Sequence, residues 1–353
     1  MKHNEKELLT ASRMATVLAC PRRHYYSYEL GLKADTDSTA LRLGTAMHRG
    51  LEERAKGADF ETAYRAAISS GALDEYMAAT IYGLLGGYYA RYGEQDELVQ
   101  DMAPELQFRH PIDGSRTFDS AGKIDGIGTV GGETVIVEHK TTGESIDPAS
   151  SYWERLAFNP QLLKYRVGAA SLGYDVRKVI YDVIKKPGIA PKEIPQLDGD
   201  GLKVVLDANG NRAIKKDGTP KQSAKAELGE VMAKAMETPE QFGDRLLADT
   251  RERPDFYYQR REVYIDGDQA EEFEIQQRGV CKAILHYKAE ARRAALPEYG
   301  WPRNCNGMSC PGCEYKGICL NSVHVDPANP PDGFRISAPN PELEENNANS
   351  NSK

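Results

Sequence analysis

The stretch 122–142, which reads GKIDGIGTVGGETVIVEHKTT, constrains the fold of this chain more than any other segment. Two runs with strand character flank a Gly-Gly pair at 131–132, and glycines accept the positive φ angles that a tight hairpin turn requires. The stretch therefore predicts two antiparallel strands. Because side chains alternate between the faces of a strand, the second strand presents Glu138 and Lys140 on one face and His139 on the other.

Charged side chains gather at one end of this hairpin. Asp125 lies on the first strand, and Glu138 and Lys140 lie on the second, separated by one residue. Two carboxylates can hold a hard divalent cation through oxygen, and a neighbouring ammonium can hold a water or a phosphate oxygen. The pattern predicts a cation site for phosphate chemistry. Glu-x-Lys on a strand is also a common exposed ion pair, so the interpretation depends on what else the chain contains.

Composition limits the class of protein. Of 353 residues, 40% are hydrophobic and 28% are charged, which is ordinary for a soluble globular chain. The apolar run at 81–89 is short and broken by glycines, so no membrane-spanning segment is expected. Residues 1–10 lack the apolar core of a signal peptide, and we therefore expect a cytoplasmic protein.

The net charge of −8 argues against a protein that coats nucleic acid indiscriminately. A local basic groove is still compatible with this charge. The pairs that could supply it, each of which is also typical of a solvated face, are Arg22-Arg23, Lys185-Lys186, Arg260-Arg261 and Arg292-Arg293.

The remaining elements follow from periodicity and turn residues. We expect helices at 12–28, 43–55, 60–92, 151–173, 237–251 and 268–295, and further strands at 104–110, 176–185 and 256–265. The order strand, strand, helix, strand predicts an α/β fold with a mixed central sheet flanked by helices, all within one domain of residues 1–325. A helical layer at 60–100, a Pro-rich surface insertion at 187–226 and a disordered tail at 326–353 complete the prediction.

Other polar residues could join the cation site. His48 sits at the edge of the apolar face of the helix 43–55, where a histidine is often a core or boundary residue. Gln161 and Tyr165 share a helix face at i, i+4, and they could orient active-site groups or form an ordinary boundary pair. Glu105 could face the cation or be an exposed carboxylate on an edge strand.

Clustered cysteines indicate a second centre. The segment 305–319 reads CNGMSCPGCEYKGIC, in which C-x2-C is followed by a further cysteine after five residues. In a reducing cytoplasm such a cluster favours a metal centre over disulfides or unrelated free thiols. A fourth ligand could come from Cys305 or, at a distance, from Cys20, which could otherwise be a small buried hydrophobe. Spacing alone does not decide between zinc and an iron–sulfur cluster, although zinc sites more often contain a second C-x2-C pair.

These segments together resemble the RecB-like branch of the PD-(D/E)xK nucleases, especially its iron–sulfur members, the AddB nuclease domain and the CRISPR-associated RecB-like exonucleases. The resemblance covers most of residues 12–321. The motifs that carry it, in chain order, are CPRRHYYSYELGL, GTAMHRGLE, GKIDGIG, VIVEHKT, QLLKY and C-x2-C-x5-C. Each motif is weak alone, and their order is what makes the resemblance specific. It implies a restriction-endonuclease-like core and a metal-dependent DNA exonuclease.

The resemblance implies a role for each matching residue. His48, Asp125 and Glu138 would hold Mg²⁺ or Mn²⁺, with the backbone carbonyl of His139 as a further ligand. An imidazole ligand would favour Mn²⁺. Lys140 would activate or position the attacking water.

Two further motifs follow from the resemblance. Gln161 and Tyr165 match the QxxxY motif of the family. A 4Fe-4S cluster, with zinc as the alternative, would join the two chain ends at 12–30 and 305–321 through Cys20, Cys310, Cys313 and Cys319. Cys305 would then be spare, although it is nearer in sequence to the other three than Cys20 is. The insertion at 187–226 looks like those of phage or prophage relatives.

The implied substrate is DNA, as single strands or duplex ends, in recombination, repair or phage DNA processing. A homo-oligomer or a recombination partner protein is compatible with the sequence. The alternatives are a DNA-end-binding accessory module with an iron–sulfur or zinc structural centre, and a zinc-stabilised fold with no DNA role. The intact set Asp125, Glu138 and Lys140 weighs against a purely binding role.

Overall fold

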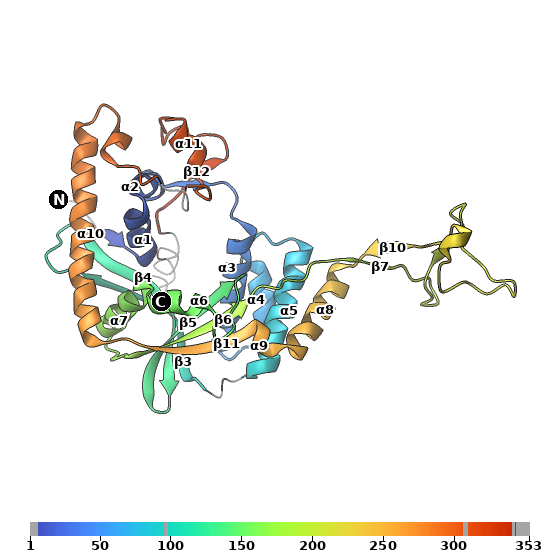
Figure 1. The fold of residues 1–353 in the computed structure, drawn as a ribbon. Coiled ribbons are helices and arrows are strands. Elements are labelled where there is room, and N and C mark those ends of the chain that lie inside the picture. The colour runs from blue at the N-terminus through green and yellow to red at the C-terminus, as the bar shows by residue number, and fades with distance from the viewer. Residues whose placement is uncertain (1–5, 95, 97, 306–309, 341–342, 344–353) are drawn as a thin grey trace, which may run out of the picture.

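The computed structural model describes residues 6–94, 96, 98–305, 310–340 and 343. Its centre is a mixed sheet whose strands are β1 (Glu7–Leu9), β3 (Gln100–Pro111), β4 (Phe118–Val130), β5 (Glu133–Thr142), β6 (Lys178–Lys185) and β11 (Tyr258–Tyr264) (Figure 1). β4 pairs with β1, β3 and β5, and the order then continues through β6 to β11. The prediction of a mixed sheet flanked by helices is confirmed.

The predicted hairpin lies in the middle of this sheet. β4 and β5 are antiparallel, with pairs running from Val130 opposite Glu133 to Gly126 opposite Val137. The turn glycines, at 131 and 132, have φ angles of 57° and 85°, as the sequence predicts. β3 is antiparallel to β4, and β1 runs parallel to its beginning.

The crossover from β5 to the parallel strand β6 contains two helices, α6 (Ser151–Ala157) and α7 (Pro160–Ser171). The sequence analysis predicts one helix over 151–173. The chain breaks it because Pro160 has no N–H for a continuing helix, and Asn159 instead caps α7 by accepting the amide of Gln161.

Helices form a layer on one side of the sheet (Figure 1): α3 (Thr39–Ala55), α4 (Phe60–Ser69), α5 (Glu75–Tyr92), α8 (Pro239–Glu252) and the short α9 (Pro254–Tyr257). Their apolar side chains share one core with Ile184 of β6. The single helix predicted over 60–92 is two, because Asp74 caps a new start for α5 after the turn at Ser70. In the part of the chain that is described, every helix is too short or too polar to cross a membrane.

The two ends of the chain meet on another side. α1 (Ala11–Ala19), α2 (Pro21–His24), a π-helical turn (Tyr25–Glu29) and β2 (Leu32–Ala34) lie against the long helix α10 (Gly267–Arg293), α11 (Lys316–Leu320) and β12 (Phe334–Ile336) (Figure 1). Pro21 breaks the helix predicted over 12–28. β12 pairs with β2, so the expected disorder from residue 326 is wrong for this segment. The Asn- and Ser-rich residues 344–353 lie outside the described part.

The predicted insertion is an arm that extends away from the sheet and the helices (Figure 1). At its base β7 (Glu193–Pro195) pairs with β10 (Lys234–Met236). Farther out, β8 (Val205–Leu206) pairs with β9 (Val231–Met232). The predicted boundary at 226 is therefore too early, because the returning strand of the arm is β10.

Glycines bring α5 unusually close to its neighbours. A Cβ atom on Gly87 would lie 2.3 Å from Thr250 Oγ1 and 2.3 Å from the hydroxyl of Tyr258. Both side chains are fully buried, so neither can move aside easily. α5 can pack here because residue 87 has no side chain.

Gly87→Ala should therefore lower the free energy of unfolding by about 1–3 kcal/mol, although alanine favours helix. Urea denaturation measures the change. The matched control is Gly279→Ala, on the exposed face of α10, where nothing lies within 4 Å of an added Cβ. The control should gain roughly 0.5–1 kcal/mol from helix propensity. Equal effects in the two variants would contradict the packing argument.

Candidate active site

Asp125 lies where the β4–β5 pairing ends. The last pair is Gly126 opposite Val137. At the next position the carboxylate of Asp125 accepts the amide N–H of His139 through Oδ2, at 2.8 Å. This contact holds the side chain of one strand against the backbone of the other, so it fixes the direction of the remaining oxygen, Oδ1.

Glu138 and Lys140 project from the same face of β5, as the alternation predicts. The ammonium of Lys140 donates to Oε1 of Glu138 at 2.5 Å and to Oε1 of Gln161 at 3.0 Å. Gln161 in turn donates to the hydroxyl of Tyr165 at 2.6 Å. The structure thus joins Glu138 and Lys140 to Gln161 and Tyr165 of α7 in one continuous hydrogen-bonded chain.

His48 reaches the site from α3. This helix can approach β5 because residue 44 is glycine, where an added Cβ would lie 3.2 Å from Thr141 Oγ1. Nδ1 of His48 is 3.6 Å from Oδ1 of Asp125. His48, Asp125 and Glu138, which are far apart in the sequence, are therefore neighbours in the fold.

The second oxygens of the two carboxylates differ in how they are engaged. Oε2 of Glu138 is buried without a hydrogen-bond partner among the described residues, and Oδ1 of Asp125 faces His48. A buried acceptor without a partner is costly, so a ligand that uses it is expected. The unpartnered oxygen of Glu138, together with Oδ1 of Asp125 and the imidazole that it faces, fits a divalent cation.

As the side chains lie, however, no three His, Cys, Asp or Glu residues of the described chain form a group that could hold a metal ion. At the site of Asp125 and Glu138, the contacts explain why the side chains do not form such a group. Lys140 engages one oxygen of Glu138, and the amide of His139 engages one oxygen of Asp125. The residue types and their closeness therefore suit a cation, while the side chains contact one another in this structure.

The two buried acids, Glu138 and Asp125, have very different pKa values. It raises the pKa of Glu138 to about 7, an effect that the nearby Asp125 charge reinforces and Lys140 opposes. Burial also pushes the pKa of Asp125 upward, but His48, His139 and Lys140 together outweigh this and hold it at about 2. For His48 itself, burial lowers the pKa, yet the charge of Asp125 brings it above the ordinary value. Asp125 is thus the firmly ionised member of the pair.

A family model, the PD-(D/E)XK nuclease superfamily, matches residues 8–320. The chain belongs to this superfamily. Membership implies a metal-dependent nuclease whose substrate is DNA, and such nucleases usually use Mg²⁺ or Mn²⁺. The prediction of the superfamily from the ordered motifs is confirmed.

Other comparisons add little to the superfamily assignment. The solved structure named "Crystal structure of SSO0001" is similar over 91% of this chain and 89% of its own, with 11% sequence identity and a TM-score of 0.33. At that TM-score the likeness carries no argument about the site. A comparison with curated proteins found no match.

Within this superfamily core, the ring of His139 points into a buried polar network that sequence reasoning missed. Its Nδ1 lies 3.4 Å from Oδ2 of Asp182, which has no exposed surface. Arg260 donates to Asp182 at 3.2 Å and to Asp96 at 2.6 Å, and Tyr88 also donates to Asp182. The available signal is one aspartate inside the apolar strand sequence VIYDVIK.

The structure also revises two weaker predictions. Glu105 is an ion-pair partner of Lys123 and not an exposed carboxylate. Two members of the basic pairs are interior residues: Arg22 donates to the carbonyl of Trp301, and Arg260 belongs to the Asp182 network. These two arginines therefore cannot line an open DNA groove.

Cysteines from both chain ends line one pocket. They are Cys20, Cys305, Cys310, Cys313 and Cys319. All are free thiols, whereas Cys281 is a buried residue of α10 and does not line the pocket. Burial raises the pKa of Cys319, whereas Arg303 and Arg22 act in the opposite direction.

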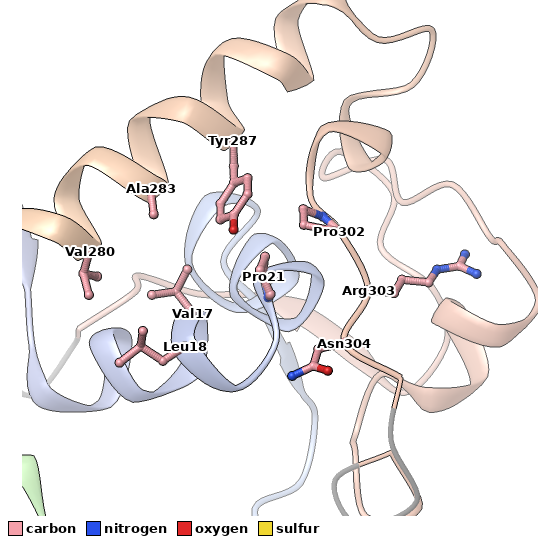
Figure 2. A pocket seen from close by; sticks show the side chains of 9 residues that line it. All are labelled: Val17, Leu18, Pro21, Val280, Ala283, Tyr287, Pro302, Arg303 and Asn304. Atoms are coloured by element: carbon pink, nitrogen blue, oxygen red, sulfur yellow. The ribbon is translucent and has the colours of Figure 1, made fainter.

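A second groove adjoins this cysteine pocket. Apolar side chains of α1 and α10, among them Val17 and Val280, line it together with residues 302–304 (Figure 2). Arg303 and Asn304 line both hollows. The side-chain amide of Asn304 donates to the carbonyl of Ala19 at 2.7 Å, which ties the C-terminal segment to the end of α1.

The raised pKa of Glu138 predicts a pH dependence of stability. Its ordinary value is 4.5, and the fold raises it to about 7 by favouring the protonated acid. The stability that Glu138 contributes is therefore complete below pH 4.5 and is lost as the pH rises through 7. In EDTA, wild type should lose up to about 3 kcal/mol over this range relative to Glu138→Gln.

Urea denaturation from about pH 4 to about pH 8 checks this expectation. The matched control is Glu61→Gln, whose side chain is 67% exposed, and its curve should run parallel to that of wild type. A parallel curve for Glu138→Gln as well would contradict the buried-acid assignment.

Proposed function

We propose that this superfamily member is a metal-dependent deoxyribonuclease that hydrolyses phosphodiester bonds at DNA ends or in single strands, in recombination, repair or phage DNA processing. We further propose that it belongs to the RecB-like, iron–sulfur branch and is related to phage or prophage members. The observation that carries the proposal is the ammonium of Lys140, held between Glu138 and Gln161 next to Asp125 and His48.

The proposed metal ligands are His48, Asp125 and Glu138, with the backbone carbonyl of His139. The unpartnered Oε2 of Glu138 and the closeness of His48 to Oδ1 of Asp125 support this set. A bound Mg²⁺ or Mn²⁺ would polarise the scissile phosphate and make an attacking water more acidic. Asp125 remains ionised over the whole physiological range, which suits a permanent ligand.

Lys140 acts in this proposal as a fixed positive charge. Burial lowers its pKa, but Glu138 and Asp125 together raise it above the ordinary value, so the amine stays protonated. A protonated amine cannot accept a proton from water. It can donate hydrogen bonds to the nucleophile and to the oxygens on which charge develops during cleavage.

Gln161 and Tyr165 position this charge. The amide oxygen of Gln161 accepts from Lys140, and its nitrogen donates to Tyr165, so the orientation of the amide is determined at both ends. The pKa of Tyr165 is raised by burial and by the acids nearby, and its hydroxyl therefore stays neutral. The complete chain of contacts favours an enzyme over an accessory module that only binds DNA ends.

Lys140→Ala or Asp125→Ala should abolish cleavage, which we take as a fall of at least about 10²–10³ in kcat, because a preorganised charge is lost in each. A cleavage assay with Mn²⁺ and labelled single- or double-stranded DNA measures the rate of cleavage. Blocking the 5′ or the 3′ end of the DNA shows the polarity of digestion. The matched control is Lys178→Ala, at the first residue of β6. Full activity in either site variant would refute the assignment, and wild-type binding without product would support the accessory module.

We also propose that the cysteine pocket holds a 4Fe-4S cluster through Cys20, Cys310, Cys313 and Cys319, with zinc as the alternative. The gathering of thiols from both chain ends supports it. A centre at this place would close a loop of nearly the whole domain, which is the role of a structural staple.

Cys313→Ala should lower the soluble yield and remove the absorbance near about 400 nm that iron–sulfur centres give. Anaerobic purification with metal analysis measures both effects. The matched control is Cys281→Ala, in the core away from the pocket, and it should keep the colour. Cys305→Ala should also keep it if Cys20 is the fourth ligand. A stable, colourless and active Cys313→Ala protein would overturn the cluster.

A further inference from the structure

A small cavity lies against the face of β5 that carries the ring of His139. Asp182 of β6 and Arg260 of β11 line it as well, together with residues of α3 and α5. Its volume is about 10 Å³, which is enough for one water molecule. The cavity therefore has room for a small ligand, on the opposite face of β5 from Glu138.

Three buried polar atoms on the walls of this cavity have no hydrogen-bond partner among the described residues. They are Nδ1 of His139, Oδ1 of Asp182 and Nε of Arg260. Their side chains meet at the other oxygen of Asp182, Oδ2, which lies 3.4 Å from Nδ1 of His139 and accepts a terminal N–H of Arg260 at 3.2 Å. Buried polar atoms are normally paired with protein or with ordered water, because leaving them unpaired is costly. The unpaired atoms therefore indicate a polar occupant.

The charges around the cavity favour a neutral occupant. Arg54 and Arg260 line it and pair with two carboxylates that also line it, Asp96 and Asp182. A bound ion would leave an uncompensated charge in the interior. A water molecule can donate to Oδ1 of Asp182, accept the Nε–H of Arg260 and keep a further position for His139. About three such contacts are typical of a buried water.

His139 connects this cavity with the candidate active site in two ways. Its backbone N–H donates to Oδ2 of Asp125 at 2.8 Å. Its ring packs edge-on against the ring of His48, with 6.1 Å between the ring centroids and 86° between the planes. Asp125 and His48 are both proposed metal ligands. A shift of His139 would therefore disturb a contact of each.

Asp182 is well placed to prevent such a shift. It lies directly opposite His139 in the register of β5 and β6. The carboxylate has no exposed surface and accepts from Tyr88 and Arg260, which come from α5 and β11. Because these contacts converge on one buried group, Asp182 offers the ring of His139 a fixed support.

We propose that the cavity holds one ordered water molecule, and that Asp182, acting through this water and through His139, is a positioning residue for Asp125 and His48. This inference rests on the proposed nuclease function and deepens it. Partners that orient metal ligands in this way typically change metal affinity or activity by about 10–100-fold when they are replaced.

A high-resolution crystal structure of the full chain tests the water directly. We expect electron density for one water molecule within hydrogen-bond distance of Oδ1 of Asp182 and Nε of Arg260. An empty cavity, or an ion in this place, would overturn the water site.

Asp182→Asn tests the positioning role, because it keeps the size of the side chain and removes its charge. Without DNA, Mn²⁺ should bind about tenfold more weakly, as measured by the electron paramagnetic resonance signal of free Mn²⁺. In the cleavage assay kcat should fall by about tenfold at saturating Mn²⁺, with KM for DNA within about twofold of wild type. The matched control is Asp96→Asn, which removes a carboxylate that pairs with Arg260 and Arg54 instead of with His139. It should bind Mn²⁺ like wild type.

A second pair of variants leaves every charge of the network in place. Val99 lines the cavity, whereas Val135 belongs to the same apolar cluster without lining it. Val99→Ile adds one carbon where the water is expected, and Mn²⁺ should bind about threefold more weakly because the displaced hydrogen bonds are not replaced. Val135→Ile adds the same carbon to the same cluster and should leave the affinity for Mn²⁺ unchanged.

Unchanged Mn²⁺ affinity in a folded Asp182→Asn protein would overturn the positioning role, and so would an equal loss in Asp96→Asn. If Asp182→Asn does not fold, equal affinities of Val99→Ile and Val135→Ile would overturn it. Failure of the proposed function has a different signature, because wild type itself would then neither bind Mn²⁺ nor cleave DNA.

Discussion

Placing two carboxylates in one buried corner is the constraint around which this structure is built. Asp125 and Glu138 repel each other, and burial makes that repulsion stronger than it would be in water. The fold answers with a different partner for each: the amide of His139 and the ring of His48 for the aspartate, and the ammonium of Lys140 for the glutamate. These partners come from β5 and α3, so the site exists only when helix and sheet have docked.

The face of β5 that carries His139 shows how the strand is held in place. Asp182 lies opposite His139 on the neighbouring strand and is the buried centre of contacts from Arg260 and Tyr88. Arg260, His139 and Tyr88 hold the pKa of Asp182 low despite complete burial, so it stays ionised. A network of this kind gives the strand one preferred position, because any shift would break several charged hydrogen bonds at once. The face that carries Glu138 and Lys140 is thereby held in place by the polar network behind it.

Much of this arrangement follows from local sequence, and the exceptions have physical causes. The hairpin, the crossover and the shared face of Glu138 and Lys140 depend on turn glycines and alternation, which short segments specify. The breaks before Pro160 and at Pro21 also have local signals. The Asp182 network could not be predicted, because its members become neighbours only through packing. β12 was equally hidden, since three residues are too few to show a period.

The contact between the two chain ends has a consequence for how this protein folds during its synthesis. β2 is synthesised long before its partner β12. The cysteine pocket has the same property, since Cys20 precedes Cys319 by almost the whole chain. The N-terminal segment therefore has no partner until β12 and Cys319 have been synthesised, and contacts of such long range are slow to form. During that interval the N-terminal segment of the nascent chain needs protection from non-native contacts.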